Sequence, residues 1–304
     1  MSKHNILALV FTAVVLVFVV INKADTGAGV PVAATEVDSA GSPQEAPDSQ
    51  EFYAATIASP QSVDIWFDEL NISARSLGVF DLKGGEFALR DETKLWPIAS
   101  ITKLMSALII YDYVPAGAKI KISAVDIVRG EHDYEMFSAG EVFTRDDLLK
   151  AMLMRSSNTA AEALANFSAD RADFIQLMNS YAVRLGMKST RFYDPSGISS
   201  QNQSNVEDLF KLVMAILTEK PQIFEITGRA AANVTELTTL ETREILNIIP
   251  FAGRPDFFGG KTGTTPAAVG NLVAVFAESG GGRVIILLGT EDRFREAELI
   301  LNKW

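Results

Sequence analysis

A serine and a lysine stand three residues apart within residues 97–103, and these residue types could support acyl transfer. The apolar residues Leu104 and Leu108 follow at helical spacing, so Ser100 and Lys103 are expected to share one face of a helix that begins near Pro97. A serine hydroxyl is a weak nucleophile until a base within hydrogen-bond reach takes its proton. A lysine serves as that base only when burial or a second cation lowers its pKa. The pair therefore indicates nucleophilic chemistry only if other parts of the chain supply partners.

Two further short motifs could supply those partners. Ser156 and Asn158 lie between two apolar-periodic segments, at an expected helix–helix junction where both residue types are also ordinary N-caps. Lys261, Thr262 and Gly263 follow two glycines just before an expected strand, and alone they would indicate a glycine-rich turn with a surface lysine. The spacing does not match a phosphate-binding P-loop. In this order, Ser-x-x-Lys, Ser-x-Asn and Lys-Thr-Gly match the motif set of class A β-lactamases and penicillin-binding proteins.

The composition excludes several other chemistries. The 304-residue chain carries 27 basic and 38 acidic residues, a net charge of −11, which argues against nucleic acid as a partner because phosphate binding needs basic patches. The absence of cysteine excludes a thiolate nucleophile and a Cys-based zinc site. No H-E-x-x-H or G-x-S-x-G motif occurs, and His132, in the loop 131–137, is expected to line the cleft entrance or to be solvated. Base catalysis would therefore fall to a lysine or a carboxylate.

Three regions follow one another along the chain. Residues 1–22 contain an apolar, uncharged run at 6–21 that is near the lower limit for spanning a bilayer, and Lys3 before it favours a cytoplasmic N-terminus. We expect a single-pass membrane anchor, with a cleaved signal peptide and a secreted protein as the alternative. Residues 23–59 are rich in small, polar and acidic residues, which predicts a flexible linker with a reach of about 35 Å. A compact domain is expected over 60–304, on the extracytoplasmic side.

The compact region predicts one sheet built from both of its ends. A β-hairpin is expected over 76–89, with a glycine turn at 83–85. Helical patterns dominate the middle, and two apolar, β-branched strands and a helix close the chain. The expected helices are 145–155 with Thr144 as N-cap, 170–184, 206–217 and 293–304, and the expected strands are 269–276 and 283–288 around a glycine-rich turn at 279–282. This order indicates an α+β fold with a mostly helical insertion.

The chain resembles the D-alanyl-D-alanine carboxypeptidase family of low-molecular-mass penicillin-binding proteins. The likeness extends from about Ala74 to Trp304. Residues 98–105 resemble the family's active-site serine segment, residues 146–150 its approach to Ser-x-Asn, and residues 185–197 the segment that follows. The resemblance implies a three-layer α/β/α fold of the β-lactamase/transpeptidase type, with an antiparallel sheet of about five strands.

Two positions depart from the family's pattern. Thr159 follows Ser-x-Asn where many relatives have Asp, and Gly259 and Gly260 precede Lys-Thr-Gly where many relatives have Gly-Ile. Both departures leave the substrate preference open.

The resemblance implies a serine peptidase mechanism that needs no metal or cofactor. Ser100 would attack the penultimate D-alanine of a peptidoglycan stem peptide, or a β-lactam antibiotic, with Lys103 as the base. Lys261 would help to keep Lys103 neutral, since like charges depress an amine's pKa. Ser156 would relay the proton to the leaving D-alanine, and water would hydrolyse the acyl-enzyme. The backbone N–H groups of Ser100 and Thr264 would form the oxyanion hole, a feature worth about 3–4 kcal/mol per donor in other enzymes.

The other motif residues are implied to bind the substrate. Asn158 would hydrogen-bond the substrate's peptide backbone. Lys261, Thr262 and Thr264 would offer a cation and hydroxyls to the terminal carboxylate. Gly263 would let the strand approach the substrate without a side chain in the way.

Three alternatives remain open. A D,D-endopeptidase would use the same groups on cross-linked peptides. A class A-type β-lactamase would need a deacylating glutamate in a Glu-x-x-Leu-Asn context, and here the position three before Leu246 is Arg243. A non-catalytic cell-wall-binding protein would keep the fold without requiring the serine and both lysines together.

Overall fold

The structure is a computed structural model that describes residues 67–82, 87–131, 136–278 and 281–303. The expected anchor, the linker and the domain start at Pro60 lie outside these residues. No helix within the described ranges is long and apolar enough to span a bilayer. The elements in chain order are β1 (Ser76–Asp81), β2 (Phe87–Arg90), β3 (Trp96–Pro97), the 3₁₀ turn η2 (Ala99–Ile101), α4 (Thr102–Tyr113), β4 (Lys119–Lys121), α5 (Ala124–Arg129), β5 (Val142–Thr144), α6 (Arg145–Met154), α7 (Asn158–Ser168), α8 (Arg171–Arg184), β6 (Gln203–Ser204), α9 (Val206–Glu219), α10 (Gln222–Thr227), β7 (Ala231–Thr235), β8 (Thr242–Leu246), β9 (Phe257–Thr265), β10 (Val269–Glu278), β11 (Gly281–Leu288) and α11 (Arg293–Lys303).

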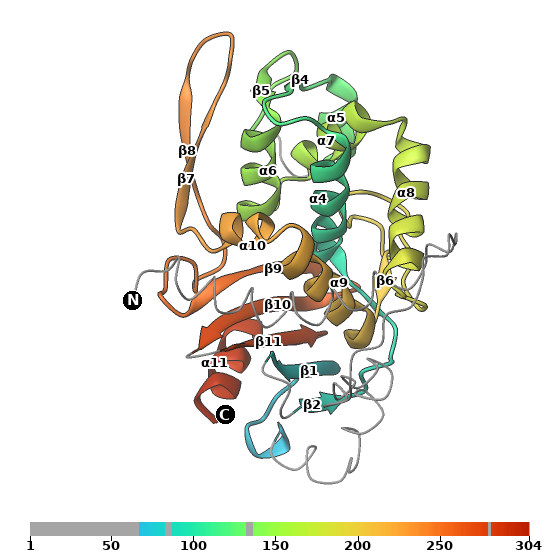
Figure 1. The fold of residues 1–304 in the computed structure, drawn as a ribbon, viewed down its shortest axis with the longest axis vertical. Helices are drawn as coiled ribbons and strands as arrows, with labels where there is room; N and C mark the ends of the chain where they lie inside the picture. The colour runs from blue at the N-terminus through green and yellow to red at the C-terminus, as the bar shows by residue number, and fades with distance from the viewer. Residues whose placement is uncertain (1–66, 83–86, 132–135, 279–280, 304) are drawn as a thin grey trace, which may run out of the picture. The chain divides into compact units, whose positions relative to one another are not determined.

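A five-stranded antiparallel sheet in the order β2–β1–β11–β10–β9 organises the fold (Figure 1). β1 pairs with β11 over its whole length, from Ser76 opposite Leu288 to Asp81 opposite Arg283. The strands at the two ends of the domain therefore lie side by side, and the prediction of one sheet built from both ends is confirmed. β10 and β11 are rich in β-branched and other apolar residues, which suits strands in the middle of a sheet.

The central strands send alternate side chains into two separate apolar cores. On one face, Val273, Val275 and Ile286 belong to a core that includes residues of α4, α6 and α9. On the other face, Leu272 and Leu287 pack in a core with residues of α11. Successive residues of a strand point to opposite faces, so a strand apolar at every position is buried on both. The sheet thus lies between helical layers (Figure 1), and the predicted α+β, three-layer fold is confirmed.

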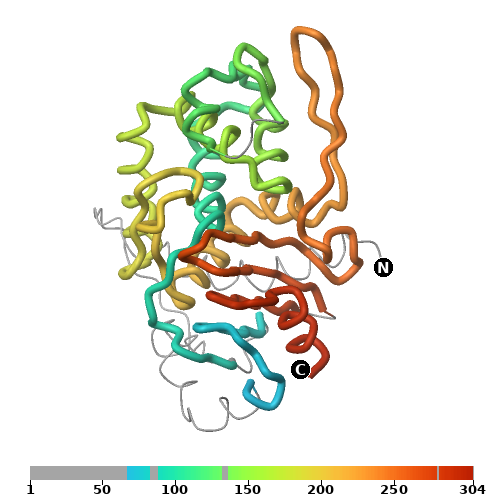
Figure 2. Tube along the Cα trace, turned by 180° about the vertical axis from the view of Figure 1, so that it is seen from behind, coloured from blue at the N-terminus to red at the C-terminus, as the bar shows by residue number. Residues whose placement is uncertain are grey.

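α4 runs through the middle of the helical layer, with α6, α7, α8 and α9 around it (Figures 1 and 2). Every residue from Thr102 to Ile110 is buried. A helix that is apolar on all sides belongs in the core of a domain. Lys103 is the one basic residue of this stretch, and it is buried together with the helix.

The long periodic segments have the predicted secondary structure. The helices predicted at 145–155, 170–184, 206–217 and 293–304 correspond to α6, α8, α9 and α11, and the strands at 269–276 and 283–288 correspond to β10 and β11. The predicted pairing of the 76–89 hairpin is confirmed by β1 and β2. The turn at 83–85, residues 279–280 of the glycine-rich turn and His132 lie outside the described residues.

The hairpin of β7 and β8 is not predicted from the sequence. It rises beside α6 (Figures 1 and 2), and two buried apolar residues, Val234 and Ile245, and several polar contacts hold it in place. Glu236, in its loop, accepts hydrogen bonds from the backbone N–H groups of Thr239 and Val142, which lower its pKa to about 2. The guanidinium of Arg243, on β8, forms an ion pair with Glu141. Short strands fixed by such long-range contacts leave little periodic signal in the sequence.

The N-cap of α6 provides a test of the fold. Thr144 Oγ1 accepts a hydrogen bond from Asp147 N at 3.0 Å, as predicted. Thr144→Ala is expected to lower the free energy of unfolding by about 1 kcal/mol, because a helix N–H loses its partner. Urea denaturation of the full-length chain measures the change. Thr238→Ala, in the exposed loop between β7 and β8, is the control, and equal losses in both variants would contradict the capping role.

Candidate active site

Ser100 lies in the tight 3₁₀ turn that connects β3 to α4. Ala99 before it has a left-handed φ of 48°, a conformation that costs a non-glycine residue on the order of 1 kcal/mol and persists only where the surroundings impose it. Ile98 N donates to Asn202 O at 3.0 Å and helps to impose it. The helix was predicted to begin near Pro97, but Pro97 belongs to β3 and α4 begins five residues later, at Thr102. The serine is therefore presented by a strained turn ahead of the helix.

Three oxygen atoms surround the Nζ atom of Lys103. It donates to Ser100 Oγ at 2.8 Å, to Asn158 Oδ1 at 2.7 Å and to the main-chain oxygen of Ser196 at 2.6 Å. Lys103 is completely buried, whereas Ser100 retains some exposed surface. An amine at this distance from a hydroxyl has the geometry that a general base needs. The sequence spacing had paired Ser100 with Lys103, but nothing in it pointed to the carbonyl of Ser196.

Ser156 lies between α6 and α7 and forms a second hydroxyl–amine pair. Its φ of 64° is left-handed, and its Oγ accepts a hydrogen bond from Lys261 Nζ at 2.9 Å. Ser157, not Ser156, is the N-cap of α7, with its Oγ accepting from Ala160 N at 3.0 Å. Asn158 is the first residue of α7 and reaches Lys103. Ser-x-Asn thus contacts both lysines, one through each of its polar side chains.

Lys261 on β9 is completely buried. Burial lowers its pKa well below the ordinary value of 10.5, and the nearby charges of Lys103 and Arg293 lower it further. Its Nζ also donates to Thr262 O at 3.0 Å. A lysine with a lowered pKa in a polar cluster can exchange protons closer to neutral pH than a solvated lysine.

The edge of β9 lies directly against the serine turn. A Cβ atom placed on Gly263 would come within 2.5 Å of Ile98 O and 3.2 Å of Ser100 N, so only glycine allows this approach. Thr262 is buried, and Thr264, one residue beyond the glycine, is exposed. The two segments that carry the N–H groups of Ser100 and Thr264 are therefore in contact, which suits the predicted oxyanion hole.

Arg293, the first residue of α11, is a site residue that is not predicted from the sequence. Its Nη1 donates to Gly263 O at 3.0 Å and hydrogen-bonds Thr264 Oγ1, and burial lowers its pKa. Cations are disfavoured at helix N-termini, so a basic residue at the first position of the final helix was the available signal. Beside the exposed Thr264, a guanidinium is suited to bind a carboxylate.

The two departures from the family pattern are packing positions. Thr159 is completely buried, and a Cβ on Gly130 would come within 2.4 Å of its Oγ1. Gly260 N donates to Thr227 Oγ1 at 2.9 Å, and a Cβ on Gly260 would come within 2.4 Å of Val273 O. A larger side chain at Gly260 would therefore require β9 to shift against β10.

Comparison with known proteins relates the chain to one enzyme family. The profile of the family described as D-alanyl-D-alanine carboxypeptidase matches residues 63–291, which include all three motifs. Over 121 residues the chain is 37% identical to a D-alanyl-D-alanine endopeptidase of Pseudomonas aeruginosa, a match that covers 39% of this chain and 39% of that relative. The match thus spans well under half of the relative's length.

Two solved structures share the fold. A D-alanyl-D-alanine carboxypeptidase from Mycobacterium tuberculosis is 27% identical, with a TM-score of 0.68 over 75% of this chain and 89% of that chain. Penicillin-binding protein D2 from Listeria monocytogenes, solved in its ampicillin-bound form, is 26% identical, with a TM-score of 0.66 over 76% of this chain and 95% of that chain.

The buried amine of Lys261 makes stability depend on pH. Below its lowered pKa the folded protein must hold an ammonium out of water, and between that pKa and 10.5 the unfolded chain binds more protons than the folded one, so stability rises with pH. Lys261→Met is therefore expected to raise the free energy of unfolding at neutral pH, because it removes the cost of holding this amine out of water. This advantage should shrink as the pH approaches 10.5. Urea denaturation across this range measures it.

Lys188→Met is the matched control, since Lys188 is exposed. It should change stability little. A loss of stability in Lys261→Met, or a gain that is constant with pH, would contradict the account.

Proposed function

The chain belongs to the D-alanyl-D-alanine carboxypeptidase family, and on that premise we propose that it is a serine D,D-carboxypeptidase that removes the terminal D-alanine from peptidoglycan stem peptides. One observation carries the proposal. Ser100 pairs with Lys103 and Ser156 pairs with Lys261, and Asn158, two residues after Ser156, accepts a hydrogen bond from Lys103. Such pairs provide a nucleophile with its base and a second route for protons.

Acylation follows from these contacts. As Ser100 Oγ bonds to the carbonyl carbon of the penultimate D-alanine, its proton passes to Lys103 Nζ, 2.8 Å away. The negative charge that develops on the carbonyl oxygen is met by the N–H groups of Ser100 and Thr264. The C–N bond of the scissile peptide then breaks. Ser156, which accepts a hydrogen bond from Lys261, passes a proton to the amine of the leaving D-alanine. Water attacks the ester on Ser100 and releases the shortened peptide.

The terminal carboxylate of the substrate fits the end of β9. Arg293, which donates to Gly263 O, and Lys261, two residues before Gly263 on β9, supply positive charge, and the hydroxyls of Thr262 and Thr264 supply donors. A β-lactam places a carboxylate near its reactive carbonyl in the same way, so we infer acylation of Ser100 by β-lactams. The ampicillin-bound form of the Listeria protein supports this inference.

A D,D-endopeptidase is the second candidate. The 37% identical relative bears that name, and the same acylation chemistry would cut a cross-link if the cleft accepts a larger leaving group. The β-lactamase alternative has less support, because Arg243 replaces the required glutamate and pairs with Glu141. A non-catalytic wall-binding role would not require the two buried serine–lysine pairs.

We also propose where the enzyme acts. Residues 1–22 would anchor it in the cell membrane, residues 23–59 would tether it, and the domain over 60–304 would reach the cell wall from the periplasmic side. The apolar run at 6–21 supports the anchor. An enzyme placed there would trim stem peptides close to the membrane and so contribute to cell-wall biogenesis and cell shape. Secretion after cleavage of residues 1–22 is the alternative.

Ser100→Ala tests the proposed function. The full-length chain is labelled with a fluorescent penicillin, and D-alanine release from a peptide ending in D-Ala-D-Ala is measured. The wild type should form a stable adduct and release D-alanine, and the variant should do neither, because the attacking oxygen is gone. Ser189→Ala, at an exposed position, is a serine control. Rapid penicillin turnover without D-alanine release would indicate a β-lactamase, and the absence of any wild-type adduct would refute both enzymatic functions.

Arg293→Gln tests the carboxylate site. Loss of a charged hydrogen-bond partner should lower kcat/KM for the D-Ala-D-Ala peptide about tenfold to a hundredfold, mainly through KM. A peptide esterified at its terminal carboxylate should be affected much less. Arg295→Gln, at an exposed position two residues away, is the control. An equal loss on both peptides would show that Arg293 does not bind the carboxylate.

A further inference from the structure

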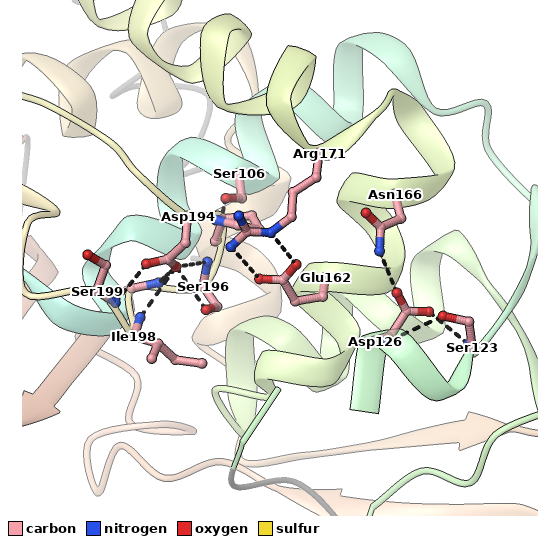
Figure 3. A network of polar contacts seen from close by, with 12 residues as sticks. Ser106, Ser123, Asp126, Glu162, Asn166, Arg171, Asp194, Ser196, Ile198 and Ser199 are labelled. Carbon is pink, nitrogen blue, oxygen red and sulfur yellow. Dashed lines mark hydrogen bonds and ion pairs between the residues drawn. The ribbon is translucent and has the colours of Figure 1, made fainter. Parts of the chain in front are cut away.

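A buried carboxylate organises the turn next to Lys103. Asp194 is only 4% exposed, and its Oδ1 accepts hydrogen bonds from Ser196 N at 2.8 Å, Ser196 Oγ at 2.9 Å, Gly197 N at 2.5 Å and Ile198 N at 3.3 Å. Its Oδ2 accepts from Ser199 N at 2.7 Å. Figure 3 shows Ser196, Ile198 and Ser199 gathered around the carboxylate. One side chain thus accepts hydrogen bonds from four consecutive backbone N–H groups of the turn, those of residues 196–199.

This turn contacts both the nucleophile and its base. The carbonyl of Ser196 accepts the hydrogen bond from Lys103 Nζ at 2.6 Å. A Cβ placed on Gly197, where φ is 89°, would come within 2.0 Å of Ala99 O and 2.9 Å of Ser100 N. The turn therefore lies against the main chain that presents the serine while it holds the amine of the lysine.

α4 fixes the same turn from a second side. Ser106 Oγ donates to Pro195 O at 2.6 Å, and Ser106 is completely buried one turn beyond Lys103 (Figure 3). The turn is therefore attached to the helix that carries the base through the carbonyl of Pro195. Asp194 then determines the direction of the next carbonyl, that of Ser196, toward Lys103.

From these contacts we infer that Asp194 is a positioning residue for the Ser100–Lys103 pair. The inference rests on the proposed acylation of Ser100. By holding the Ser196 carbonyl on Nζ, Asp194 leaves the amine aligned with Ser100 Oγ. Its negative charge is one peptide unit away from Lys103 and favours the ammonium that forms when the serine proton is taken up.

Other charged groups near Lys103 set the background for this effect. Lys261 on β9 and Arg293 on α11 are cations close to the pair, and Lys261 interacts directly with the charge of Lys103. On α7, Glu162 is buried with Arg171 as its ion-pair partner at 3.0 Å, and burial raises its pKa, with a smaller contribution from Asp194. The negative charge that contacts the Ser196 turn directly is that of Asp194.

Asp194→Asn separates positioning from simple stabilisation. The full-length variant is acylated with a fluorescent penicillin between about pH 5 and about pH 10, and the rate constant is compared with that of the wild type. We expect a fall of about 10²-fold, the effect of misplacing reacting groups by about 1 Å. We also expect the acid limb of the pH profile to move to lower pH, because removal of a nearby anion favours the neutral amine.

Asp208→Asn is the matched control. Asp208, on α9, is also buried, and it accepts hydrogen bonds from Ser189 N at 2.8 Å and Thr190 Oγ1 at 2.9 Å. Its loss should lower the unfolding temperature while leaving the acylation rate and the acid limb unchanged. Unchanged kinetics in Asp194→Asn, or a fall in rate with an unmoved acid limb, would overturn the inference.

A second variant tests the inference even if Asp194→Asn does not fold. Ser196→Ala removes one donor to the carboxylate but keeps the carbonyl and the charge, so the acylation rate should fall about tenfold with the acid limb in place. A wild-type rate in Ser196→Ala would overturn the inference. Absence of acylation in the wild type would instead refute the proposed function itself.

Discussion

Two lysine side chains buried beside each other are the constraint on which the site depends. Lys103 and Lys261 have no exposed surface, and an ammonium taken out of water is costly unless it gains hydrogen bonds or loses its proton. Each amine donates to a serine hydroxyl and to a main-chain carbonyl. Because those acceptors come from separate segments, the amines are satisfied only when the helical layer and the sheet are both complete.

The sheet and the central helix each position part of the site. α4 carries the base and, through the turn before it, the nucleophile, whereas β9 carries the second lysine at the edge of the sheet. The junction of α6 and α7 brings Ser156 and Asn158 between these two parts. Three motifs separated by many residues meet because strands from both ends of the domain form one sheet and its helical insertion covers one face.

The sequence predicted the features that repeat or that stand in recognisable order. Long apolar periods predicted α6, α8, α9, β10 and β11, and the three motifs predicted which residues would meet. Contacts made by single residues across long distances could not be predicted. Arg293 reaches Gly263 only because α11 packs against β10 and β11 with its first residue toward β9, and the Ser196 carbonyl reaches Lys103 only because Asp194 shapes a turn. The β7–β8 hairpin was missed because its two buried apolar residues and its long-range polar contacts leave no regular apolar pattern in the sequence.

The close approach of glycines to the serine turn has a consequence for how such a site can change over evolutionary time. Gly197 and Gly263 come from different layers, and both lie against the main chain of residues 98–100. The atoms that a new side chain would meet are mostly backbone atoms, which cannot move aside as a flexible side chain can. The position of the nucleophile is therefore a fixed trait rather than one that drifts by small steps. Diversification among descendants of this chain would be concentrated at exposed positions outside the site, while the buried centre is inherited unchanged.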